Sequence, residues 1–143
     1  MSLPAVIVRF WRQEPSRRAL LAEALLALVA ASAAIRLLPF SKAVGLGARP
    51  LPQRKPPPEA VVRDTVACVE AAARRIPWKT LCFQKGLALQ WILRRRGIDA
   101  RLHYGVGQDK EGELAAHVWI AADGDIVIGG EQAPRFRSLI VLP

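Results

Sequence analysis

Apolar and polar positions change their spacing along this chain, and the change separates a helical part from a strand part. Residues 19–40 (ALLAEALLALVAASAAIRLLPF) are almost wholly apolar, interrupted by Glu23 and Arg36. Ala and Leu are strong helix formers and Pro39 ends a helix, so a helix is predicted here. The unbroken apolar run, residues 24–35, is shorter than the roughly 20 residues that cross a bilayer. We expect a packing helix, with docking to a membrane surface or a partner as the alternative.

Two later segments repeat with the helical period of 3.6 residues. Residues 59–75 (EAVVRDTVACVEAAARR) place Val and Ala on one stripe. Cys68 on its flank is interpreted as a small buried hydrophobe. Residues 81–96 (LCFQKGLALQWILRRR) are apolar on most sides, which is typical of a central buried helix. Thr80 is its expected N-cap, and Gly97 occupies the position of a left-handed helix cap.

Beyond the second of these helices the apolar period becomes two, the period of a strand. Residues 99–106, 115–122 and 125–129 alternate in this way. A polar loop separates the first two, and Asp123-Gly124 between the last two is a strong hairpin signal. The predicted fold class is therefore α+β: a central cysteine-bearing helix on a small three-stranded antiparallel sheet, preceded by an N-terminal helix.

Composition divides the chain into three parts. Residues 1–44 form a basic opening followed by the apolar helix. Residues 45–58 (GLGARPLPQRKPPP) contain five prolines without a period, as in a linker or an extended strap. Residues 59–143 form the predicted core domain.

Charge and cysteine content narrow the function. The 143 residues include 21 Lys and Arg against 12 Asp and Glu, a net charge of +9 that favours acidic partners. Zinc-finger spacing, RNA-binding aromatic motifs and Gly-rich phosphate loops are missing from the sequence, so no nucleic-acid partner, metal or cofactor is expected. The three arginines at positions 94–96 complement a helix dipole. Two cysteines inside predicted helices make no disulfide framework, so we expect a reduced, cytoplasmic protein.

Cys82 and His117 are the candidate catalytic pair. Cys82 lies in the first helical turn, where unpaired N–H groups and the positive dipole end stabilise a thiolate. Both histidines, His103 and His117, lie on predicted strands, and Trp119 shares a strand face with His117. A thiolate, an imidazole and a third group that orients the imidazole form the arrangement of cysteine proteases and transglutaminases. Gly86, one turn after Cys82, leaves room for a neighbouring backbone or a substrate.

Several motifs in order resemble the leader peptidases of lasso-peptide biosynthesis, the transglutaminase-like B proteins in their short form. The resemblance rests on the apolar helix ending in Leu-Pro-Phe, the segment LCFQKGLALQWILRRRGIDARLHYGV and the segment AHVWIAADGDIVIGG. It covers most of the chain. It implies a papain- or transglutaminase-like core, and a cysteine peptidase that removes the leader from a ribosomally made precursor. Cys82 would be the nucleophile and His117 the general base and acid, while the family does not require a histidine at the position of His103.

The third catalytic member is where the sequence departs from the family's Cys-His-Asp pattern. Asp123 lies six residues beyond His117, about 20 Å along a strand. With a three-residue hairpin loop His117 faces Glu131, whereas with a two-residue loop it faces Gly130 unless the glycine pair forms a bulge. We predict Glu131 as the third member, with Asp123 or a backbone or amide group as alternatives.

The resemblance also implies partners. These are the precursor peptide, a separate leader-recognition protein and the ring-closing cyclase. The separate recognition protein is expected because residues 1–58 leave no room for the winged domain that grips a leader. Contact with a membrane surface through residues 19–38 stays open, so the expected location is cytoplasmic with or without membrane association. An acyltransferase of the transglutaminase or arylamine N-acetyltransferase type, and a non-catalytic peptide- or membrane-binding scaffold, are the alternative functions.

Overall fold

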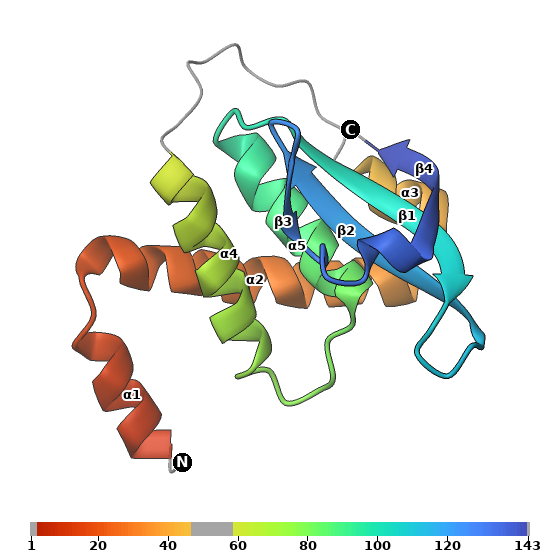
Figure 1. The fold of residues 1–143 in the computed structure, drawn as a ribbon. Coiled ribbons are helices and arrows are strands. Elements are labelled where there is room, and N and C mark those ends of the chain that lie inside the picture. The colour runs from red at the N-terminus through yellow and green to blue at the C-terminus, as the bar shows by residue number, and fades with distance from the viewer. Residues whose placement is uncertain (1–2, 47–58, 143) are drawn as a thin grey trace.

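Helices cover one face of a small antiparallel sheet (Figure 1). The computed structural model describes residues 3–46 and 59–142. This mixture of helices and a small antiparallel sheet agrees with the predicted α+β class. Along the chain the elements are α1 (Leu3–Trp11), α2 (Pro15–Leu37), α3 (Phe40–Gly45), α4 (Glu59–Ala73), α5 (Cys82–Arg95), β1 (Ala100–Gln108), β2 (Leu114–Ala122), β3 (Asp125–Ile128), the 3₁₀ turn η1 (Ala133–Arg135) and β4 (Phe136–Leu142).

The N-terminal half contains the predicted apolar helix and two short helices that were not predicted. α2 ends at Leu37, two residues before Pro39, which cannot continue a helix, so the predicted stop is confirmed. Its inward face is fully buried at Ala24, Leu28 and Ala31, in the same core cluster as α4, α5 and the sheet. Of the predicted linker, residues 47–58 lie outside the described part of the chain. The short helices α1 and α3 lack the long periodic run on which sequence reasoning depends.

The central helix is α5, as predicted. Its core side chains Leu87, Leu89 and Ile92 have no exposed surface. A Cβ on Gly86 would lie 2.9 Å from Cγ1 of Val118, so the missing side chain lets α5 pack closely on β2. Close packing against the sheet therefore explains this glycine.

The cap at the C-terminal end of α5 was predicted correctly, whereas the cap at its N-terminal end was not. At its C-terminal end Gly97 has φ +79°, and its N–H donates to the carbonyl of Arg94 at 3.0 Å. The N–H of Ile98 donates to Leu93 at 3.1 Å, which completes a Schellman motif and confirms the predicted cap. At the other end the prediction of Thr80 as N-cap is wrong, because Leu81 is the capping residue.

The sheet has four strands in the order β3-β2-β1-β4, one more than predicted. β4 pairs antiparallel with β1, and its side chains are mostly exposed. Backbone pairing rather than an alternating apolar face forms this strand, so the hydrophobic pattern did not reveal it. Gln90 of α5, fully buried, donates to the carbonyls of Ala100 and Leu142 and so ties β1 and β4 to the helix layer.

The β2–β3 hairpin turns through two residues. Asp123 and Gly124 both have positive φ, +50° and +92°, as a type I′ turn requires. A bulge follows, because Ala121 pairs with Ile126 whereas Ile120 pairs with Ile128. The extra residue shifts all later positions of this segment by one relative to β2.

Candidate active site

A cleft of about 640 Å³ lies between the helix layer and the edge of β2. Cys82, His117 and Glu131, the three residues predicted to carry the chemistry, all border it. The fold therefore brings together side chains that are far apart in sequence. Its full lining comprises Val66, Glu70, Cys82, Lys85, Ala116, His117, Val118 and residues 126–132.

Cys82 is the first residue of α5, and its thiol is free and partly exposed. The first N–H groups of a helix have no partner within the helix, so they are available to a negatively charged atom beside Cys82. On the same rim, Nζ of Lys85 lies 3.3 Å from a carboxylate oxygen of Glu70. This end of the cleft thus offers a thiol, helix N–H groups and a paired lysine.

Gln84 and Trp78, which lie near the cysteine in sequence, do not serve as donors to the cleft. Oε1 of Gln84 accepts the N–H of Leu81 at 2.6 Å, and its Nε2 donates to Oγ of Ser32 at 3.3 Å. Nε1 of Trp78 donates to the same hydroxyl at 3.2 Å. Both side chains therefore fasten the segment before α5 to α2, and the backbone N–H of Cys82 remains the candidate oxyanion donor.

His117 is buried on β2, and a backbone carbonyl sets its tautomer. Nε2 lies 2.9 Å from the carbonyl oxygen of Gly129. A carbonyl can only accept, so Nε2 carries the hydrogen, and Nδ1 of the neutral ring is left with a free lone pair. The rings of Trp119 and Phe136 pack on the imidazole, at centroid distances of 6.1 and 5.1 Å. In the neutral form of the ring Nδ1 is therefore the nitrogen that can accept a proton.

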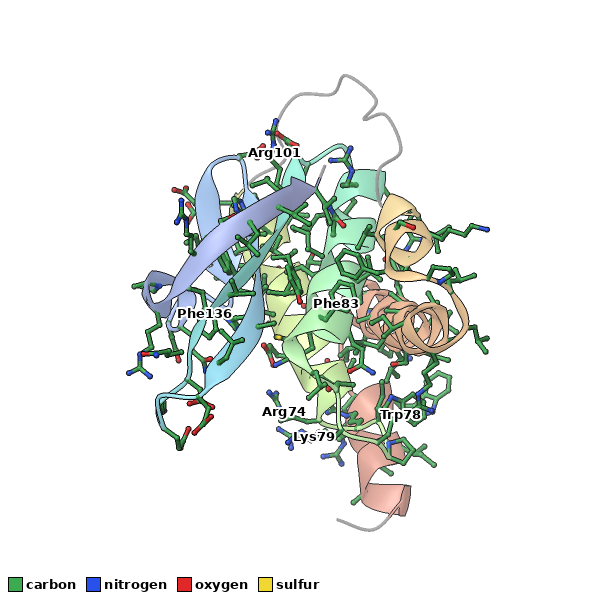
Figure 2. The ribbon with its side chains drawn as sticks, turned by 90° about the vertical axis from the view of Figure 1, so that its right-hand side faces the viewer. Arg74, Trp78, Lys79, Phe83, Arg101 and Phe136 are labelled. Atoms are coloured by element: carbon green, nitrogen blue, oxygen red, sulfur yellow. The ribbon has the colours of Figure 1, made fainter. Side chains whose placement is uncertain are left out.

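The imidazole and the thiol approach the cleft from opposite faces of β2. Val118 and Ile120 face Gly86 of α5. Neighbouring residues of a strand point to opposite faces, so the ring of His117 faces away from α5. Figure 2 views the layers from the side, with the sheet and Phe136 to one side of α5. Cys82 and His117 both line one cavity, and among the described residues no hydrogen bond joins them.

The third member stays a prediction. Glu131 lines the cleft, and the β3 bulge restores the register in which it would face His117, three residues beyond the Ile120–Ile128 pair. β3 ends before that point, and Nε2 is occupied by Gly129, the backbone alternative. In the described part of the chain no hydrogen bond links Glu131 to His117. Asp123 lies in the hairpin turn and does not line the cleft.

The remaining histidine, His103, and the remaining cysteine, Cys68, both pack against other side chains and do not line the cleft. The His103 ring stacks on Trp119 at 5.4 Å and 10°, with Nδ1 3.5 Å from Oγ of Ser138. Burial lowers the pKa of His103, and Arg101 adds to this effect. Cys68 is fully buried among apolar side chains, and burial raises the pKa of its thiol. The interpretation of Cys68 as a buried hydrophobe is confirmed.

The family of this protein follows from its sequence once the site is in view. Residues 25–141 match the transglutaminase-like superfamily, which is most of the chain, so the protein belongs to that superfamily. Domains of this kind are typically cysteine-dependent enzymes, and they include peptidases and acyltransferases. No curated protein and no solved structure matches the chain.

Proposed function

We propose that this protein is a cysteine peptidase that removes the leader from a ribosomally made precursor peptide. One observation carries the proposal: Cys82 begins a central helix at the edge of a 640 Å³ cleft that His117 also borders. Membership of the transglutaminase-like superfamily supports cysteine chemistry at this position. A lasso precursor is proposed as the substrate because LCFQKG, LRRRGI and the His-x-Trp strand resemble the leader peptidases of that pathway.

The proposed reaction passes through an acyl-enzyme. The Cys82 thiol loses its proton to Nδ1 of His117, and the sulfur attacks the carbonyl carbon of the scissile bond. N–H groups at the start of α5 stabilise the tetrahedral oxyanion. His117 returns the proton to the leaving amine, and water then attacks the thioester, losing a proton to His117. The leader leaves with a free carboxylate and the thiol is regenerated.

This mechanism requires a movement at the edge of β2. In the structure the carbonyl of Gly129 holds the His117 ring on the face away from α5. Catalytic hydrogen bonds often form only in the complex with substrate. We infer that substrate binding in the cleft displaces residues 129–132, which line it, and lets the imidazole turn toward Cys82.

The test is cleavage of the precursor peptide, followed by mass spectrometry. Wild type should release the leader with the mass of one added water, and Cys82→Ala should release none. Cys68→Ala removes the other thiol and is the matched control, which should retain cleavage. Hydrolysis by Cys82→Ala at the wild-type rate would overturn the proposal.

Two further outcomes of the same assay separate the alternatives. An acyltransferase would pass the acyl group to an added amine, so an amide product in place of the acid would favour that class. The proposed dependence on a separate leader-recognition protein predicts slow cleavage by this chain alone and fast cleavage with that protein. Full-speed cleavage by the chain alone would remove this dependence.

A further inference from the structure

One side of α2 faces solvent and carries almost no polar groups. Its exposed apolar residues recur three or four positions apart, the spacing of a single helix face. Leu26 is 72% exposed and Leu37 is 81% exposed. A surface helix normally presents charged and polar residues to water, whereas this solvent-facing side of α2 is apolar. We name it the α2 stripe; it consists of Ala22, Leu26, Val29, Ala30, Ala33 and Leu37.

The opposite side of α2 is part of the protein core. By length and composition α2 could cross a membrane, with a mean hydropathy of 2.0 over its most apolar window, although its unbroken apolar run suggested otherwise. Ala24, Leu28 and Ala31 are nevertheless fully buried against the rest of the domain. Crossing a bilayer would remove these side chains from the core. A helix with one buried face and one exposed apolar face instead fits a membrane surface, with its axis in the plane of the membrane.

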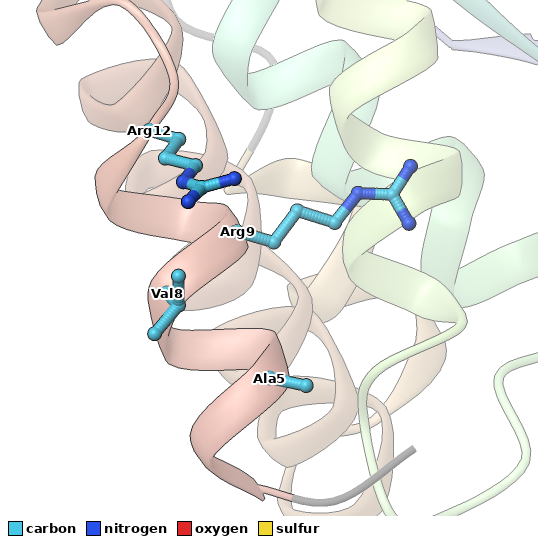
Figure 3. A pocket seen from close by; sticks show the side chains of 4 residues that line it. All are labelled: Ala5, Val8, Arg9 and Arg12. Atoms are coloured by element: carbon cyan, nitrogen blue, oxygen red, sulfur yellow. The ribbon is translucent and has the colours of Figure 1, made fainter.

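Basic and aromatic side chains lie on α1 and in the first turn of α2, N-terminal to the stripe. Trp11 of α1 is 67% exposed, and the guanidinium of Arg18 lies over its ring, 5.1 Å from the centroid. Figure 3 shows Arg9 and Arg12 leaving the same side of α1, where they border a hollow of about 490 Å³ with Ala5 and Val8. Tryptophan and arginine are the residues that anchor helices at the level of lipid headgroups.

The charges around the stripe are mostly positive. Residues 3–46 contain six basic and two acidic side chains. Of the two acids, Glu23 is already bound by the arginines at the end of α5. Arg36 in the last turn of α2 and Lys42 in α3 continue the positive charge at the other end of the stripe. An anionic surface complements this distribution, whereas a second copy of the chain would bring like charges together.

We propose that the α2 stripe, together with α1, docks this protein on an anionic membrane surface. The apolar side chains enter the boundary between headgroups and acyl chains, and the arginines contact lipid phosphates. Cys82 remains free to act because its cleft lies on the other side of the helix layer, between α4, α5 and the sheet. This proposal is independent of the peptidase activity.

The experiment is vesicle flotation with the full chain and no precursor peptide. Wild type should float with vesicles of phosphatidylcholine and phosphatidylglycerol, stay in solution with phosphatidylcholine alone, and dissociate at high salt. Leu26→Glu/Val29→Glu should reduce binding at least about tenfold, because both carboxylates would enter the interface. Leu114→Glu/Leu139→Glu places the same charges at exposed positions of the sheet and should bind like wild type.

A second pair of variants tests the charges. Arg9→Gln/Arg12→Gln should weaken binding about fivefold for each charge removed. Lys110→Gln/Arg137→Gln, at exposed positions of the sheet and its hairpin, is the matched control. Cys82→Ala should float like wild type, which separates this proposal from the peptidase.

Other outcomes overturn the membrane proposal. Wild type that stays in solution with anionic vesicles, or equal binding to neutral ones, contradicts it. A lipid-free dimer that Leu26→Glu/Val29→Glu converts to a monomer in light scattering would assign the stripe to a second copy. Loss of leader-recognition protein binding in that variant, without any vesicle binding by wild type, would assign it to a protein partner.

Discussion

The two ends of α5 are built in opposite ways. At the C-terminal end Arg95 and Arg96 each lie 2.6 Å from a carboxylate oxygen of Glu23 on α2, and Gly97 closes the last turn. At the N-terminal end Leu81 offers no side-chain cap, and Cys82 opens into a cleft. One end is closed by ion pairs and a glycine cap; the other exposes a thiol and the first helical N–H groups.

This difference shows how one helix can serve stability and chemistry at once. The arginines could be taken for a binding surface because the chain is so basic, but their contacts with Glu23 make two of them a link between α2 and α5. Ion pairs hold the far end of the helix and its middle packs on β2, while the Cys82 thiol at the near end stays partly exposed. The open end is therefore where a substrate can bind.

The largest expected effect concerns the two thiols. In single-cysteine proteins a thiol-directed probe should label Cys82 about 10⁴-fold faster than Cys68, since Cys68 reacts only after an opening that costs several kcal/mol. Labelling followed by mass spectrometry near neutral pH measures the ratio. In denaturant the two rates should become similar. Equal rates in the native protein would mean that the start of α5 is not open.

Replacing His117 should have the next largest effect. His117→Ala removes the proposed base and should reduce leader hydrolysis on the order of 10³-fold. Rates of precursor cleavage with the Cys82 thiol intact provide the measurement. His103→Gln, on the neighbouring strand, is the matched control and should retain a near wild-type rate. A wild-type rate of leader hydrolysis in His117→Ala would mean that His117 is not the base that activates Cys82.

Gly86→Ala tests the packing between the two ends of the helix. The added methyl would lie 2.9 Å from Cγ1 of Val118, a stiff buried side chain. Overpacking of this kind costs about 1–3 kcal/mol, and the gain in helix propensity offsets up to about 1 kcal/mol of it. Denaturant unfolding should show a net loss of about 1–2 kcal/mol. Adding Val118→Ala should remove the clash, so a purely additive double variant would contradict the close contact.

Glu23→Gln should have the smallest effect, confined to stability. The half-exposed pairs with Arg95 and Arg96 suggest a loss of about 1 kcal/mol in the free energy of unfolding. The hydrogen bond from Arg96 lowers the pKa of Glu23 below its ordinary 4.5. Its stabilisation is therefore full above that value and is lost as the pH falls through the lowered pKa.

Urea unfolding of wild type and Glu23→Gln at several pH values checks this. The difference between the two proteins should be constant near neutral pH and shrink below about pH 4. Leader hydrolysis at neutral pH should be unchanged. A difference that grew on acidification would mean that Glu23 stabilises the fold in another way.

Local patterns determined much of the fold. Long apolar periodicity predicted α2, α4 and α5. Gly97 marked the end of α5, and the Asp-Gly turn marked the β2–β3 hairpin. β4 escaped prediction because its stability comes from pairing with β1, a partner about 35 residues away in the register. The extra residue of the β3 bulge was also invisible, because periodicity cannot show where one residue is left unpaired.

The sequence by itself determined that a cysteine begins a buried helix and that a histidine lies on a following strand, because both depend on local spacing. Only the tertiary structure decided which groups surround them. It placed Cys82 and His117 at one cleft, turned the imidazole to the far face of β2, and supplied the carbonyl of Gly129 as its partner. A backbone carbonyl has no residue type, so its role depends on strand register and turn geometry rather than on any pattern of side chains.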